Sequence, residues 1–167
     1  MTFVRQTAAA VALIILSLWV QSGGMAALIG SVRTSLGPGT HKLGPLRSAV
    51  LMMRFTTAII ALHVLQILLW ASFYRWFCFS QWESAFYFST ASYTTVGSGN
   101  VVLPQMWRIL GPVERLVGVL MCGLSASFLF TMVTRLVEGE VRFASQLTRL
   151  VTQLRPTPKD STLSALR

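Results

Sequence analysis

The chain has 167 residues, of which 53% are hydrophobic and only 11% are charged, and its net charge is +9. Soluble domains usually contain about 25% charged residues. This composition, with a mean hydropathy of +0.62, therefore excludes an ordinary water-soluble domain and indicates an all-α integral membrane protein in a lipid bilayer. The basic residues lie at the ends of apolar runs and form no dense basic patch, which argues against a nucleic-acid partner.

The titratable side chains form no catalytic or metal-binding pattern. The cysteines, Cys78 and Cys122, lie in or near two different apolar runs, so we expect no disulfide between them and no paired-cysteine metal site. The carboxylates and the two histidines are too scattered to form an acid–base pair or a triad. We therefore expect neither an enzyme nor a small-molecule substrate nor a cofactor. The five carboxylates are Glu83, Glu114, Glu138, Glu140 and Asp160.

Residues 1–30 are predicted to form an N-terminal transmembrane helix. Thr7 to Ile29 contains no charge and is long enough to cross a hydrocarbon core of about 30 Å. Gln21 to Gly24 weakens this run, so we expect a kink or fraying there. The alternative is a cleaved signal peptide, because Arg5 precedes the apolar run and small residues follow it. Retention is favoured, since cleavage would send the following basic loop outward.

Residues 31–54 are predicted to form a basic cytoplasmic connector and the start of the second span. Glycine, proline and basic residues dominate the connector, and the second span is expected from Ser48 to Trp76. Aromatic rings near its end suit the membrane–water interface. Within this span we expect the polar side chains of His63 and Gln66 to form hydrogen bonds to other helices.

The segment after the second span cannot be one transmembrane helix, although it is uncharged from Ser84 to Trp107. Glycine and proline break its second half, which leaves a helix over Trp82 to Thr94 of about 20 Å, too short to cross a bilayer. Ser80 and Glu83 have the spacing of a capping box, which predicts where this helix begins. We expect a re-entrant loop, because irregular backbone at membrane depth must line water or lie within protein.

The last span is predicted from Val113 to Leu136, and its small residues favour close helix packing. Gly123 is a possible hinge in this span. Residues 138–167 are predicted to form a short cytoplasmic amphipathic helix followed by a disordered tail after Pro156. That helix would either bundle with copies of itself or lie on the membrane.

The distribution of basic residues predicts the orientation of the chain. The connector with Arg54 carries four cations and the segment from Arg135 onward carries six, against four on the other side. The positive-inside rule then places the N-terminus outside and the C-terminus in the cytoplasm of a multi-pass inner-membrane protein. The re-entrant loop would enter the membrane from outside.

The segment from Ala85 to Asn100, with its sequence TTVGSGN behind an aromatic helix, resembles the pore helix and selectivity filter of the potassium-channel family. The similarity extends over residues 55–137 and points to small bacterial ion channels with one pore loop and an added N-terminal helix. It implies a homotetramer that conducts K⁺, or both K⁺ and Na⁺, through rings of backbone carbonyls. Gating by voltage is not expected, because no span carries regularly spaced arginines.

The resemblance assigns roles to individual residues of this loop. The inner ion site would be formed by Thr95, and the carbonyls of Val96, Gly97 and Ser98 would form the next rings. Gly99 would supply a turn and the outermost oxygen. The residues expected to support this filter are Tyr87, Phe88, Tyr93, Thr94 and Asn100.

Two positions depart from the family pattern TVGYG followed by an acid. Ser98 replaces the aromatic residue that holds the filter at its width, and Asn100 replaces the acid. Ala91 also stands where some members carry a glutamate behind the filter. The similar sequence TVGDGN belongs to nonselective relatives that conduct sodium and potassium. We therefore expect reduced potassium selectivity, with a nonconducting accessory membrane subunit as the further alternative.

Overall fold

The computed structural model describes residues 2–35 and 45–154, and within these ranges it contains helices and no strand. The helices are α1 (Thr2–Ser35), α2 (Pro45–Phe77), α3 (Trp82–Tyr93), the short 3-10 helix η1 (Gln105–Trp107) and α4 (Leu110–Leu154). Residues 36–44 of the predicted connector segment and the tail after residue 154 lie outside the described residues, whereas residues 31–35 belong to α1 and residues 45–54 to α2.

Three of these helices are long and apolar enough to cross a membrane. The candidate spans are Phe3–Val32, Ser48–Phe77 and Gln105–Arg135, with a mean hydropathy of 1.7 or more in each. They match the three spans predicted from the sequence and confirm the all-α membrane fold. The membrane location therefore rests on both the composition and the observed helices.

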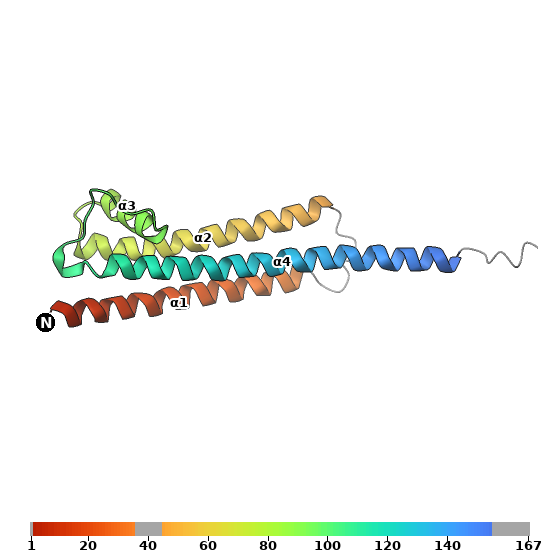
Figure 1. The fold of residues 1–167 in the computed structure, drawn as a ribbon, viewed down its shortest axis with the longest axis horizontal. Helices are drawn as coiled ribbons and strands as arrows, with labels where there is room; N and C mark the ends of the chain where they lie inside the picture. Colours follow the sequence, from red (N-terminus) through yellow and green to blue (C-terminus); the bar gives the residue numbers. More distant parts are fainter. Residues whose placement is uncertain (1, 36–44, 155–167) are drawn as a thin grey trace, which may run out of the picture.

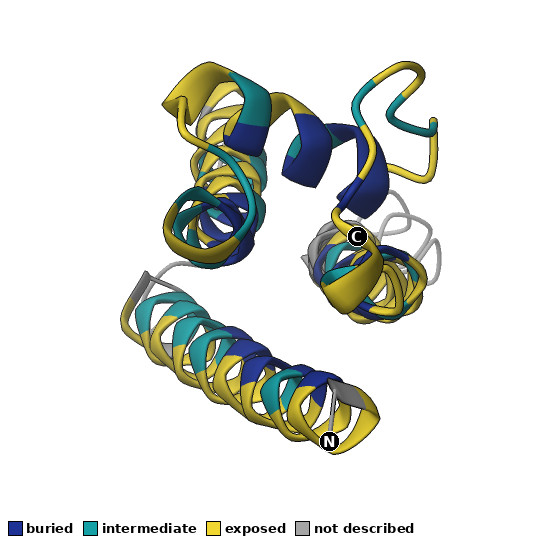
Figure 2. Cartoon of the chain, turned by 90° about the vertical axis from the view of Figure 1, so that its left-hand side faces the viewer, coloured by how far each residue is buried: buried dark blue, intermediate teal, exposed yellow. Residues whose placement is uncertain are grey.

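The long helices run side by side, and α3 lies across one end of them (Figure 1). Viewed along the bundle, α3 bridges α2 and α4 on the side opposite α1 (Figure 2). Its 12 residues extend only about 18 Å, after which the chain returns to the end from which it came. The N-terminus of α1 and the beginnings of α3 and α4 share this end. The re-entrant path expected for this segment is therefore present.

The start of α3 differs from the prediction in its capping. The helix begins at Trp82, as expected, but its N-cap residue is Gln81, and no side chain caps it by a hydrogen bond. Ser80 lies one residue too early to serve as the N-cap. The capping box predicted from Ser80 and Glu83 is therefore wrong, although Glu83 still favours the first turn through the helix dipole.

Two long helices continue where breaks were expected. The α1 helix runs through Gln21 to Gly24, where the Gln21 amide donates a 3.2 Å hydrogen bond to the Ser125 hydroxyl of α4. The α4 helix extends without interruption for 45 residues, about 67 Å. The predicted amphipathic segment after residue 138 is thus the continuation of α4 and not a separate short helix.

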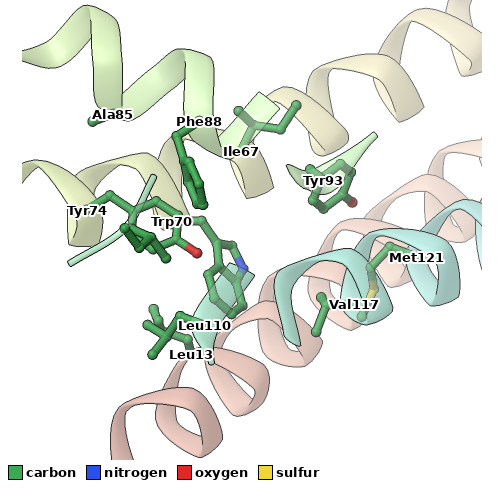
Figure 3. Close-up of a cluster of buried hydrophobic side chains, with 11 residues drawn as sticks. Leu13, Ile67, Trp70, Tyr74, Ala85, Phe88, Tyr93, Leu110, Val117 and Met121 are labelled. Carbon is green, nitrogen blue, oxygen red and sulfur yellow. The ribbon is translucent and has the colours of Figure 1, made fainter. Parts of the chain in front are cut away.

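A hydrophobic core joins α2, α3 and α4 near the re-entrant end (Figure 3). Trp70 and Tyr74 of α2 are completely buried, and the Tyr74 ring packs edge-on against Phe88 of α3 at 5.1 Å between centroids. Leu110 of α4 closes this cluster from the other side. Trp70 and Tyr74, two of the aromatic residues predicted to lie near the membrane interface, therefore pack inside the bundle and help to position α3, whereas Trp76 is exposed.

Buried polar side chains attach α1 to this core. Gln66 of α2 donates a 2.7 Å hydrogen bond to the backbone carbonyl of Ser17, and the Trp70 indole donates to the Ser17 hydroxyl at 3.0 Å. Both Gln66 and Ser17 are fully buried. The helix-to-helix role predicted for Gln66 is confirmed, and it specifies how α1 docks.

Replacing Gln66 with leucine should therefore loosen α1 without removing apolar volume. Hydrogen bonds between membrane helices contribute about 0.6 kcal/mol on average, so we expect a small fall in thermal stability and faster proteolysis of α1. The matched control is Ser72→Ala, because the Ser72 hydroxyl bonds only within its own helix, to the Leu68 carbonyl. Equal stability of the Gln66→Leu variant and the wild type would contradict this role.

Candidate functional site: the re-entrant loop

The re-entrant loop begins at the C-terminus of α3, where its own amide groups cap the helix. The Thr94 N–H donates to the Thr90 carbonyl and the Thr95 N–H donates to Ser92, both at 3.0 Å. The Gly97 N–H reaches the Ala91 carbonyl, also at 3.0 Å. The last carbonyls of α3 are thereby satisfied, and the first filter residues are fixed to the helix end.

The sign of the backbone angle φ alternates from residue to residue along the loop. Thr95, Gly97 and Gly99 have φ angles of +64°, +94° and +55°, whereas Val96 and Ser98 do not have positive φ. In an extended strand successive carbonyls point to opposite sides, but alternation between left- and right-handed conformations turns successive peptide groups to the same side. The loop therefore has the backbone needed to present a row of oxygens along one face.

Thr95 adopts its left-handed conformation at a cost. It occupies the position just after the helix C-cap, where glycine is the usual residue, and a β-branched residue with positive φ is a true outlier. The penalty is about 1–2 kcal/mol. Such strain persists where the surrounding structure imposes it, often at a functional site.

Three consecutive carbonyls of the loop lack a backbone donor. Within the described part of the chain, no backbone N–H donates to the carbonyl of Thr95, Val96 or Gly97. The Ser98 carbonyl differs, because it accepts a 3.0 Å hydrogen bond from the Val101 N–H. Unpaired carbonyls at membrane depth need another partner, and a dehydrated cation is one that the row could bind.

The remaining residues proposed to support the filter lie in different surroundings. Thr94 and Asn100 are exposed in the isolated chain, and Val96 is 82% exposed. The Tyr87 hydroxyl lies 4.0 Å from the position that a Cβ of Gly99 would occupy. Tyr87 is thus the pore-helix ring nearest to the outer end of the loop.

Phe88 and Tyr93 are both buried, but they face different neighbours. Phe88 packs on Tyr74 and Phe79, within the core between α2 and α4. Tyr93 is the last residue of α3, and its hydroxyl lies 2.9 Å from Nδ1 of His63 on α2. The helix-to-helix role predicted for His63 is confirmed. Phe88 therefore acts on the loop only by placing α3.

A buried carboxylate connects all three helices that surround the loop. The Glu114 side chain, near the start of α4, is completely buried. Its Oε2 accepts a 2.9 Å hydrogen bond from the Tyr74 hydroxyl of α2, and its Oε1 accepts a 2.5 Å bond from Ser89 of α3. The Ser89 hydroxyl also lies 3.0 Å from the Ile67 carbonyl. A buried polar group that loses such a partner costs about 1–3 kcal/mol.

One helical turn further along, α3 and α4 meet backbone to backbone. A Cβ added to Gly118 would collide with the carbonyl of Tyr93. Glycine is therefore required at this position of α4, which agrees with the close packing predicted for the small residues of this span. By contrast, a Cβ at Gly123 would meet nothing within 4 Å. The packing within this chain therefore does not require glycine at the position where a hinge was predicted.

The cysteines and acidic residues form no second site in the described ranges. Cys78 and Cys122 are free thiols, which confirms the absence of a disulfide between them. Burial raises the pKa of Cys78 to about 12, so this thiol stays protonated and unreactive at neutral pH. No group of three or more His, Cys, Asp or Glu side chains is placed to hold a metal in these ranges.

Glu114 was not predicted to belong to a site, because the carboxylates are scattered along the sequence. The signal was present, since an ionisable residue within an apolar span is rare and usually paired. Its partners Tyr74 and Ser89 lie 40 and 25 residues away along the chain. Separations of that size leave no periodic pattern in a sequence.

Comparison with known proteins gives one match. Residues 53–135 match the family model described as "Ion channel". The match covers α2, α3, the loop and the apolar part of α4, and it supports an ion-channel pore domain in this segment. No curated protein and no solved structure matched the chain.

The contact at Gly118 generates a direct test of this packing. Gly118→Ala should force the end of α3 away from α4, and overpacking of this kind costs about 1–3 kcal/mol. The matched control is Gly23→Ala on α1, where an added Cβ meets nothing within 4 Å and where alanine improves helix propensity by up to about 1 kcal/mol. Thermal unfolding in detergent compares the two variants. An unchanged midpoint for Gly118→Ala would contradict the close contact.

Proposed function

We propose that four copies of this chain surround a common axis and conduct monovalent cations through their filter loops. The observation that carries this proposal is the loop backbone, in which φ is positive at Thr95, Gly97 and Gly99 and the carbonyls of Thr95, Val96 and Gly97 lack backbone donors. A permeating cation in a carbonyl filter exchanges its water for these oxygens. The match of residues 53–135 to the ion-channel family supports a cation channel.

The number of subunits follows from the number of oxygens. One chain contributes one carbonyl to each layer of the filter, whereas a dehydrated potassium ion takes about eight oxygens from two stacked layers. Four loops around an axis satisfy that requirement. The C-terminal end of α3 adds partial negative charge near the filter, which favours a cation over an anion.

The orientation proposed from the basic residues agrees with the arrangement of the helices. The N-terminus of α1 and the beginnings of α3 and α4 lie at one end of the bundle (Figure 1). The excess of basic residues in the connector and the C-terminal segment favours the cytoplasmic side of the inner membrane for the other end of the bundle. The filter would then open to the outside, and α4 would extend inward beyond the bilayer.

A channel with little preference between sodium and potassium is the second candidate function. Ser98 is too small to fill the space that an aromatic residue occupies in the potassium-channel family. Its carbonyl is also engaged by the Val101 N–H, so it is a weaker ligand for an ion than the three carbonyls before it. A filter with three strong layers and a loosely held outer end would discriminate less between the two ions.

Reversal potentials of the reconstituted full chain test conduction and selectivity together. In planar bilayers with opposed sodium and potassium gradients, we expect a cation current whose reversal potential lies between the two Nernst values. A reversal potential at the potassium value would contradict the loss of selectivity. The absence of any current from a correctly assembled tetramer would favour a nonconducting accessory subunit.

The variant Ser98→Tyr should increase preference for potassium if filter width is the cause. A buried aromatic contact contributes about 0.5–1.5 kcal/mol beyond burial, so the permeability ratio should rise by up to about tenfold. Ser98→Ala is the matched control, because it removes the hydroxyl without adding a ring. Equal permeability ratios in both variants would show that width at this position does not set selectivity.

A further inference from the structure

We propose that Glu114 and Ser89 are positioning residues that hold the filter loop in its conducting geometry, as a brace behind the pore helix. This inference rests on the proposed channel function, and it assigns a role to a buried carboxylate that the conduction pathway itself does not use. Neither side chain touches the ion. Both act through the C-terminus of α3, to which the loop is attached.

The brace has two rungs, each of which joins α3 to both neighbouring helices. At the first rung, Ser89 of α3 bonds to Glu114 of α4 and lies 3.0 Å from the Ile67 carbonyl of α2. At the second rung, four residues further along α3, Tyr93 bonds to His63 of α2. Ile67 and His63 are also four residues apart, so the contacts are in register along both helices.

The contact with α4 follows the same register. Glu114 bonds to Ser89, and Gly118, one turn later, presses against the carbonyl of Tyr93. The end of α3 is thus held by side-chain hydrogen bonds at one turn and by backbone contact at the next. A rotation of α3 would break the first contact and a translation would break the second. The two together allow α3 a single position.

The position of the end of α3 determines the conformation of the loop, because the loop amides are hydrogen-bonded to the last turn of α3. The amides of Thr95 and Gly97 donate to the carbonyls of Ser92 and Ala91, which lie between the two rungs. Thr95 must also be kept in a left-handed conformation that it does not prefer. A fixed helix end supplies the constraint that this strained conformation requires.

The brace compensates for supports that the sequence lacks. Ser98 provides no aromatic ring at the outer end of the filter, and Ala91 provides no carboxylate directly behind it. The structure places a carboxylate between α2 and α3 from a different element, α4. Tyr74 orients that carboxylate with its own 2.9 Å hydrogen bond, so Ser89 meets an acceptor of fixed direction.

Hydrogen exchange of the full chain in lipid nanodiscs tests the brace without reference to current. Ser89→Ala and Glu114→Met should each accelerate exchange of the Thr95 and Gly97 amides by up to about tenfold, since a buried hydrogen bond to the end of α3 is lost. Glu114→Gln keeps an acceptor and should retain most of the protection. The double variant Ser89→Ala with Glu114→Met should show less than the sum of the two single effects, because the Ser89–Glu114 bond is already lost in each single variant.

Two control variants separate the brace from general damage. Ser127→Ala removes a hydroxyl of α4 that bonds only within its own helix, to Gly123, and Glu83→Gln neutralises an exposed carboxylate in the first turn of α3. Both should leave exchange of the filter amides unchanged. Ser89→Ala, the milder substitution, decides the question if Glu114→Met does not fold.

The outcomes distinguish this inference from the proposed function. Faster filter exchange in Ser89→Ala, together with an altered sodium-to-potassium permeability ratio, supports the brace. Filter amides that remain as protected as in the wild type overturn it, whether or not the protein conducts. A wild-type protein that carries no current overturns the channel, while the exchange comparison still decides whether Ser89 and Glu114 position the loop.

Discussion

The structure depends on one constraint, which is that a short irregular loop must keep its backbone carbonyls unpaired at membrane depth. Apolar surroundings make such groups costly, and the left-handed conformation of Thr95 adds strain. The contacts that hold α3 and the loop in place meet this constraint. The loop amides cap α3, aromatic side chains pack α3 against α2, and a carboxylate ties α3 to α4.

The α1 helix adds further polar contacts to the bundle. Ser17 receives hydrogen bonds from two residues of α2, and Gln21 donates to Ser125 of α4. In lipid, apolar side chains gain little by leaving the bilayer for a helix interface, so polar contacts and close packing specify how helices associate. A buried polar seam of this kind identifies α1 as an integral part of the bundle, in contrast to a segment that is only a membrane anchor.

Much of this architecture was predictable from the sequence because its signals are local. The three spans follow from runs of apolar residues, and the short α3 follows from the glycines and the proline that prevent a fourth span. The backbone of Gly97 and Gly99 was anticipated for the same reason, since glycine permits positive φ. The hydrogen-bonding role of His63 and Gln66 followed from polar side chains inside an apolar helix.

The features that were missed depend on contacts between distant residues. Glu114 meets Tyr74 and Ser89 only after three helices have packed. The requirement for glycine at position 118 of α4 arises from the backbone carbonyl of Tyr93, at the end of α3. The prediction of Ser80 as the N-cap of α3 was wrong because the helix begins at Trp82, which makes Gln81 the N-cap residue. The uninterrupted α4 shows that the last span and the amphipathic segment predicted after it are one helix.

The most direct test of the central claim is a structure of the purified full chain in a lipid bilayer containing thallium or rubidium. The account predicts four subunits around one axis, with cation density on that axis between the carbonyls of Thr95, Val96 and Gly97. A monomer or dimer without an axial pathway, or a tetramer whose loops leave the axis free of ions, would contradict it.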